Sequence, residues 1–196
     1  SVVKINENGS PVEFYVAKHD YEPSLNGTGR TLLVRKDCCD QIAFNSTGIN
    51  KYASGTVETW LNETYKSQLD ANIRSAISTT MFYYTIGDNN TTITTLSRSV
   101  FLLSGKECDK TQQLANSEGS VLPIASKLQI AYYNGSAVEW WSRTPMNDNK
   151  WQACHFSTAS NFGYGNCSAS RYTRPCFTIP SNALFDEDTL LFKGVA

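Results

Sequence analysis

Long apolar runs and an excess of positive charge are both missing from this sequence. The longest apolar stretches, such as Val100 to Leu103, are far shorter than the roughly 20 residues that span a bilayer. The chain has 17 lysines and arginines against 18 aspartates and glutamates, which gives a net charge of -1. We therefore expect neither membrane insertion nor nucleic-acid binding, because the latter requires a basic surface.

Side chains for catalysis and metal binding are also scarce. Only two histidines, His19 and His155, are available for a catalytic triad, and neither lies in a nucleophile-elbow pattern. The GxxxxGK[ST] loop, the HExxH helix and the calcium loop of EF-hands do not occur. Cys154, Cys167 and Cys176 could join His155 in binding zinc, but the short C-x-x-C spacing is absent. The sequence thus predicts no catalytic residue, no metal site and no cofactor, with a carboxylate pair for glycoside hydrolysis as an open alternative.

The six cysteines lack the density and regular spacing of a small disulfide-rich scaffold. A chain of 196 residues can bury enough surface to be stable without such crosslinks. We therefore interpret the cysteines mainly as buried free thiols. A disulfide between two of Cys154, Cys167 and Cys176 is the alternative.

The length and the absence of a composition break predict one domain that spans residues 1–196. Apolar alternation indicates strands at Val12–Val16 and Thr31–Arg35. Apolar residues at three- and four-residue steps then predict helix from Thr56 to Ile77, either continuous or broken near Asn62–Lys66.

Turn residues follow this helical segment. Gly87 to Asn90 predicts a hairpin or an exposed loop, and Asn134-Gly135 is a favoured hairpin dipeptide. Strands, then helices, then short strands and loops form an order that favours the α+β class with an antiparallel sheet.

The stretch from 147 to 173 contains no leucine, isoleucine, valine or methionine. Aromatic side chains among serine, glycine and asparagine are typical of binding loops, because they give contact area at a low entropic cost. The alternative is a polar surface loop whose aromatic side chains are tucked inward. On the first interpretation the ligand-binding residues are Asn147, Asn149, Trp151, His155, Ser157, Asn161, Phe162, Tyr164, Asn166, Ser168, Ser170 and Tyr172.

Four blocks carry a resemblance to a known family. They are Ser54 to Asn62, Val100 to Glu107, Glu139 to Pro145 with its WW-x-R-[ST]-P pattern, and Thr173 to Pro180. The sequence resembles a bacterial and phage domain family of unknown function, similar in architecture to C-type lectins, formylglycine-generating enzymes and retroelement-diversified binding proteins. The resemblance implies a C-type-lectin-like fold with two helices, a small antiparallel sheet and a long, loop-rich C-terminal half.

The same resemblance implies a non-catalytic, extracellular domain on a phage virion or bacterial cell surface. It would bind a protein or glycan receptor on a target cell through a variable loop surface at about 147–173, as in diversity-generating retroelement systems. Homo-oligomer formation and a place in the virion are open. The alternatives are a formylglycine-generating type of cysteine and copper oxidase, another enzyme, or a purely structural virion or cell-wall module.

The sequence lacks two motifs found in other proteins of that fold, and this narrows the functions expected of it. The EPN and WND motifs of calcium-dependent lectins are missing, since Ser24 follows Glu22-Pro23 and Gln152 follows Trp151. The glycine-rich arginine block of the formylglycine-generating enzymes is also missing. Calcium-dependent sugar binding is therefore not expected.

The tryptophan pair and two arginines near it are interpreted as scaffold. Trp140 and Trp141 would face opposite sides of one strand and anchor both layers. Arg143 or Arg174 would pair with a buried carboxylate. The neighbouring prolines at 145 and 175 belong to the same scaffold blocks.

Overall fold

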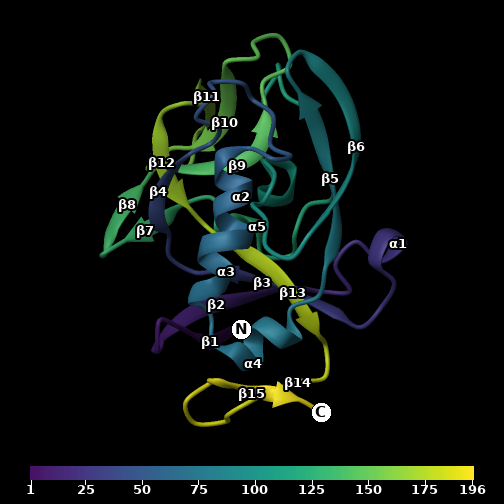
Figure 1. The fold of residues 1–196 in the computed structure, drawn as a ribbon, viewed down its shortest axis with the longest axis vertical. Coiled ribbons are helices and arrows are strands. Elements are labelled where there is room, and N and C mark those ends of the chain that lie inside the picture. Colours follow the sequence, from purple (N-terminus) through teal and green to yellow (C-terminus); the bar gives the residue numbers. More distant parts are fainter.

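The computed structural model describes residues 1–196 and is mostly β (Figure 1). Strands hold 44% of the residues and helices 15%. A four-stranded antiparallel sheet has the order β1-β2-β3-β13. Its strands are β1 (Val2–Glu7), β2 (Ser10–His19), β3 (Arg30–Arg35) and β13 (Cys176–Pro180). The strands predicted within β2 and at β3 are confirmed.

A five-stranded sheet has the order β11-β10-β9-β12-β4. Neighbours are antiparallel except β9 and β12, which run parallel where Trp140 pairs with Tyr172. Its strands are β4 (Cys39–Ala43), β9 (Trp140–Pro145), β10 (Gln152–Phe156), β11 (Phe162–Asn166) and β12 (Ser170–Thr173).

Three separate hairpins complete the strands. They are β5 (Thr80–Gly87) with β6 (Asn90–Arg98), β7 (Ala131–Tyr133) with β8 (Ser136–Val138), and β14 (Ala183–Phe185) with β15 (Phe192–Val195). The hairpins predicted around 87–90 and at Asn134-Gly135 are confirmed. Asn134 and Gly135 have φ angles of 49° and 79°, the paired positive values that a type I′ turn requires.

The principal helix runs through α2 (Thr56–Trp60), the π-helical turn η1 (Leu61–Tyr65) and α3 (Lys66–Gln68). The alternative break near Asn62–Lys66 is wrong, because the chain stays helical there. Asn62 donates to the carbonyls of Glu58 and Val100, which ties the π turn to the core. The chain leaves the helix only at Leu69, before α4 (Ala71–Ala76).

The remaining helical pieces are short. They are α1 (Pro23–Asn26), α5 (Ala125–Leu128) and the 3-10 turn η2 (Lys106–Cys108). None of the helices has both the length and the apolar character needed to cross a membrane.

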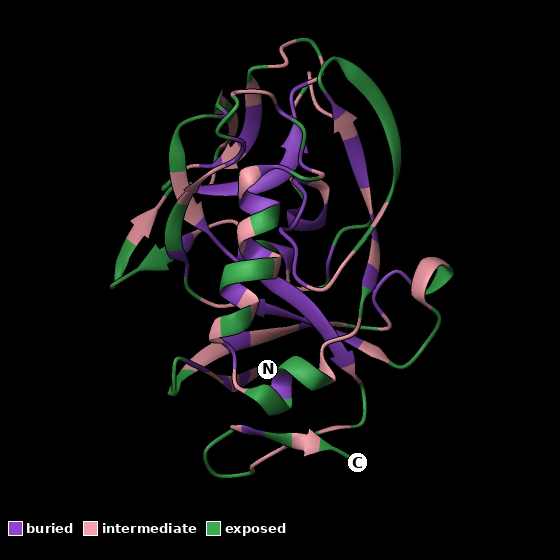
Figure 2. Ribbon diagram, in the orientation of Figure 1, coloured by how far each residue is buried: buried purple, intermediate pink, exposed green.

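The buried apolar side chains form one cluster of 36 residues that draws on both sheets and the principal helix (Figure 2). Trp140 and Trp141 are fully buried, as predicted. They face opposite sides of β9, since Trp140 stacks on Phe156 at 4.2 Å between ring centroids and Trp141 contacts Phe44 at 5.5 Å. The tryptophan pair therefore joins packing on the two faces of the five-stranded sheet.

The predicted α+β, C-type-lectin-like fold with two helices and a small sheet is wrong. The chain is mostly β, with several sheets and one helix of 13 residues. The expected loop-rich C-terminal half is also wrong, because β9 to β13 occupy much of residues 140–180. These strands contain glycine, serine and asparagine in place of alternating aliphatic residues, so their sequence carried little strand signal.

Candidate ligand-binding surface

The 147–173 stretch is built around the β10–β11 hairpin at the edge of the five-stranded sheet (Figure 1). In its register Cys154 pairs with Tyr164, and His155 pairs with Gly163. Paired residues share a face, and successive residues alternate between faces. One face therefore carries Cys154 and Tyr164, and the other carries His155.

Two of the predicted binding residues present large aromatic surfaces to solvent. Trp151 is 51% exposed and Tyr164 is 42% exposed. Trp151 directly precedes β10, and its carbonyl accepts a hydrogen bond from the Cys167 amide, which extends the pairing with β11. Trp151 lies in the turn before β10 with its ring beside Gly48, whereas strand alternation places Tyr164 on the face opposite His155. The region thus exposes one aromatic residue in the turn that leads into β10 and one on β11.

Several predicted binding residues form the turns of this hairpin. Ser157 Oγ accepts from the amides of Ala159 and Asn161, and Asn149 Oδ1 accepts from the amide of Trp151. Asn166 Oδ1 accepts from the amide and the hydroxyl of Ser168. Bonds of this kind are why serine and asparagine are favoured in turns. The polar composition therefore has a local structural cause.

Two further predicted binding residues, Phe162 and Tyr172, pack against the protein. The Phe162 ring lies 4.9 Å from the Phe156 ring, between centroids. It also occupies the space beside Gly105, where a Cβ would meet it at 2.3 Å. The Tyr172 ring lies 4.7 Å from the Tyr133 ring. These aromatic side chains are half-buried, so they are better placed to support the hairpin than to contact a ligand directly.

The other predicted residues lie at the edges of the same region. Asn147 is half-buried and its side-chain amide donates to Asn116 Oδ1. Asn161 is exposed in the turn between β10 and β11, and Ser170 is exposed at the start of β12. The structure thus distributes the predicted residues around the hairpin and does not gather them on one face.

A charged group that sequence reasoning missed lies beside His155. We call Glu139, Trp141, His155 and Arg171 the Arg171 patch. The Arg171 guanidinium stacks on the Trp141 ring, 4.5 Å from its centroid, and Arg171 Nε donates to Glu139 Oε2 at 3.1 Å. The same guanidinium covers Gly165, where a Cβ would approach Nη2 to 2.5 Å. Glycine at 165 therefore lets the arginine lie flat on the sheet.

Only the carboxylate of the patch is largely open to solvent, since the Glu139 side chain is 48% exposed against 17% for Arg171 and 12% for His155. Burial, with help from the nearby Arg171 charge, lowers the pKa of His155, so its imidazole is neutral near neutral pH. Glu139 is half-exposed, whereas Arg171 Nη1 is enclosed and has no hydrogen-bond partner. No residue of the sequence signals this arrangement, because Glu139 and Arg171 are 32 positions apart and meet only across strands.

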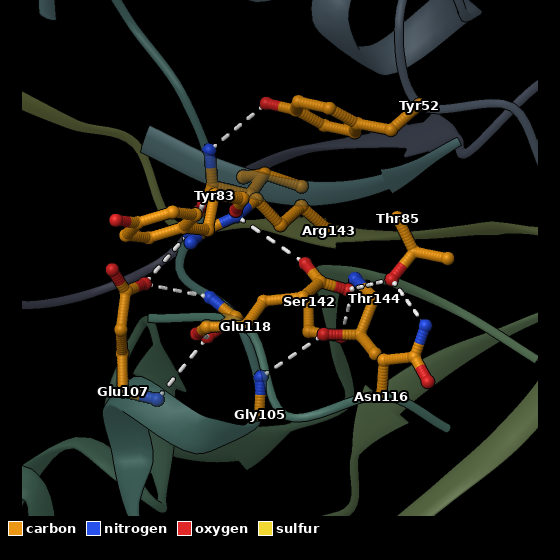
Figure 3. Close-up of polar contacts among 12 residues, drawn as sticks. Tyr52, Tyr83, Thr85, Gly105, Glu107, Asn116, Glu118, Ser142, Arg143 and Thr144 are labelled. Carbon is orange, nitrogen blue, oxygen red and sulfur yellow. Dashed lines mark hydrogen bonds and ion pairs between the residues drawn. The ribbon is translucent and has the colours of Figure 1, made fainter. Parts of the chain in front are cut away.

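A fully buried polar network fixes the strand below the patch (Figure 3). Arg143 in β9 donates to Glu107 Oε2 at 2.6 Å and to the carbonyls of Tyr83 and Leu102. Its Nε lies 3.5 Å from Glu118 Oε2. The prediction that an arginine of this block pairs with a buried carboxylate is confirmed for Arg143.

Arg174 is buried as well but pairs with no carboxylate. It donates to the carbonyls of Arg35, Lys36 and Leu128 and lies 5.2 Å from the Trp140 ring centroid. Both arginines thus tie their strands to distant backbone segments.

All six cysteines are free and buried, which confirms the expectation of free thiols over a disulfide. Burial raises the pKa of Cys38, Cys39 and Cys167 to about 12, and it also raises that of Cys154. A thiol needs to ionise to act as a nucleophile. No three histidine, cysteine, aspartate or glutamate side chains converge in a way that could hold a metal ion.

Comparison with known proteins shows the family to which the chain belongs. Residues 28–181 match the family described as a domain of unknown function, DUF6273, and the chain is a member of that family. No curated protein matches the chain, and no solved structure matches it.

Proposed function

We propose that this chain is a non-catalytic binding domain that contacts a protein or glycan through Trp151 and the Arg171 patch. The observation that carries the proposal is the exposed Trp151 ring at the entry to β10, the strand whose His155 lies beside the half-exposed Glu139 carboxylate and the Arg171 guanidinium. Tryptophan and arginine are the residues most enriched among those that dominate binding energy. Display on a phage or bacterial surface, where the ligand is a receptor on a target cell, belongs to the same proposal.

The chemistry of the face supports binding over catalysis. His155 lies 4.0 Å from Glu139 Oε2, but the patch offers no serine, threonine or cysteine that the imidazole could activate. Cys154, the neighbour of His155, points to the opposite face of β10 and is fully buried. A cysteine-dependent oxidase would need an accessible thiolate, and burial disfavours that form of every cysteine here.

The first experiment screens the labelled 196-residue chain against a glycan array and against intact bacterial cells, and then measures affinity for the strongest ligand. Trp151→Ala should weaken binding about thirtyfold or more, the loss typical of an interface anchor. Tyr164→Ala is the matched control, because it removes another exposed aromatic residue, from the face opposite the Arg171 patch. A larger loss from Tyr164→Ala than from Trp151→Ala would move the site to the opposite face, and no loss from either would refute the hairpin as the binding surface.

The proposed sequence variability of 147–173 has its own test. Deep sequencing of the locus in related isolates would look for a near-repeat of these codons and a nearby reverse transcriptase gene. Outward residues such as Trp151 and Tyr164 should then vary, whereas Cys154 and Phe156 should stay apolar because they are fully buried. Variation spread equally over inward and outward positions would contradict a diversified binding face.

A further inference from the structure

A second hollow lies away from the β10–β11 hairpin, between α1, the β5–β6 hairpin and the segment at 117–120. Asn26 fixes α1 to β5, since its side chain exchanges two hydrogen bonds with the backbone of Met81. Figure 1 shows α1 at the side of the molecule that β5 and β6 occupy. The hollow has a volume of about 350 Å³ and is lined by Glu22, Ser24, Tyr83, Ile93, Ser117, Gly119 and Ser120.

Glu22 is the one charged residue in this lining. It is only 6% exposed, and none of the ion pairs of the chain includes its carboxylate. No side chain donates a hydrogen bond to it either. The Glu22 oxygens are not among the enclosed polar atoms that lack a partner, so they reach the hollow. A carboxylate that is nine-tenths buried and opens only onto a hollow is therefore suited to a ligand that supplies the missing donor.

The electrostatics of the surrounding core favour a cation. Glu22 Oε1 and Glu107 Oε1 lie 3.3 Å and 3.4 Å from the position that a Cβ would take on Gly119. The Arg143 guanidinium beside Glu107 already donates to that carboxylate and to two backbone carbonyls. Arg143 thus serves Glu107 and Glu118, and no ion pair connects it to Glu22. The Glu22 carboxylate therefore faces the hollow without a cation from the chain.

We propose that this hollow binds a primary ammonium group carried on a short apolar chain, as in a lysine side chain. The Glu22 carboxylate would accept a charge-assisted hydrogen bond from the ammonium, and the hydroxyls of Ser117 and Ser120 would accept the others. Tyr83 and Ile93 provide apolar surface for the methylene stem and a ring for the cation. This site is separate from Trp151 and the Arg171 patch, so it stands without the proposed function.

The test uses Nα-acetyl-lysine-methylamide as the probe and Nα-acetyl-norleucine-methylamide as its uncharged apolar match. Amide chemical shifts of the intact chain are followed during titration with each compound. We expect saturable shifts at Gly119 and Tyr83 with the lysine probe and at least tenfold weaker binding of the norleucine probe. Glu22→Gln should weaken lysine binding about tenfold or more, because a hydrogen bond to a charged group is lost. Glu63→Gln, which changes an exposed carboxylate elsewhere, should leave it unchanged.

Ile93→Lys provides a second variant, should Glu22→Gln disturb folding. Ile93 is 42% exposed at the rim of the hollow, so the substitution should be tolerated, and its own ammonium should compete with the probe. Loss of lysine binding in this variant supports the site. Equal binding of the two probes, unchanged binding in both Glu22→Gln and Ile93→Lys, or no saturable shift at all would overturn the proposal.

Discussion

Glu118 should make the stability of this protein fall as the pH rises through the mildly acidic range. Its carboxyl is fully buried, accepts a hydrogen bond from Thr85 Oγ1 at 3.0 Å and lies 3.5 Å from Arg143 Nε. Burial outweighs the attraction of Arg143 and raises the pKa of Glu118 from 4.5 to about 7. The folded state therefore holds this proton more tightly than the unfolded chain. The stabilising contribution is complete below about pH 4.5 and is lost as the pH rises toward about 7.

The size of the effect follows from the pKa difference, and it is about 3 kcal/mol in total. Glu118→Gln keeps a neutral side chain of similar shape at every pH. Urea denaturation gives the free energy of unfolding of the variant and of the wild type at each pH. The difference between them should shift in favour of the variant by about 3 kcal/mol between about pH 4.5 and about pH 8.

Glu63→Gln, at an exposed position, controls for the general titration of carboxylates. A difference between wild type and Glu118→Gln that is constant with pH would refute the reasoning. A variant that becomes relatively less stable as the pH rises would refute it as well, because Glu118 would then be stabilised in its ionised form.

Replacing Trp141 or Trp151 by alanine should affect stability very differently. Trp141→Ala should lower the free energy of unfolding by about 3 to 5 kcal/mol, whereas Trp151→Ala should change it by less than about 0.5 kcal/mol, and similar losses would contradict their assigned environments. Arg143→Met should cost about 3 to 5 kcal/mol in the same denaturation assay, because Glu107 would stay buried without its cation, and an unchanged stability would mean that the pair is not ionised. All six thiols should react with Ellman's reagent in guanidinium chloride but not in the native protein at mildly alkaline pH, since all are buried, and rapid native labelling would show an accessible thiolate.

The parts of the fold that sequence reasoning predicted depend on local signals. Asn134-Gly135 has the two positive φ angles of its turn type, and turn residues fixed the β5–β6 hairpin in the same way. The WW-x-R block was interpreted as scaffold because adjacent strand residues face opposite layers, and Trp140, Trp141 and Arg143 are all fully buried. In each case a few neighbouring residues carried enough information.

The features that were missed depend on contacts between distant segments. The strands β10 to β12 were expected to be a loop, because their polar residues form turns and their inward positions are filled by Ala153, Cys154 and Phe156, without aliphatic side chains. Pairing with β9 and β4 decides that these residues are strands, and no local pattern encodes that pairing. The Arg171 patch was missed for the same reason, since Glu139 and Arg171 meet only through the sheet.

The two buried arginines also explain how the 147–173 stretch can lack a conventional core pattern. Arg143 precedes this stretch by a few residues, and Arg174 directly follows it. Their side chains donate hydrogen bonds to backbone carbonyls of distant segments and so fix both ends of the stretch. Because these bonds run from side chain to backbone, they do not depend on which residues occupy the hairpin between them. The hairpin then needs only a few inward positions, such as Ala153 and Phe156, to pack on the tryptophans. Its outward positions are consequently free to serve ligand binding.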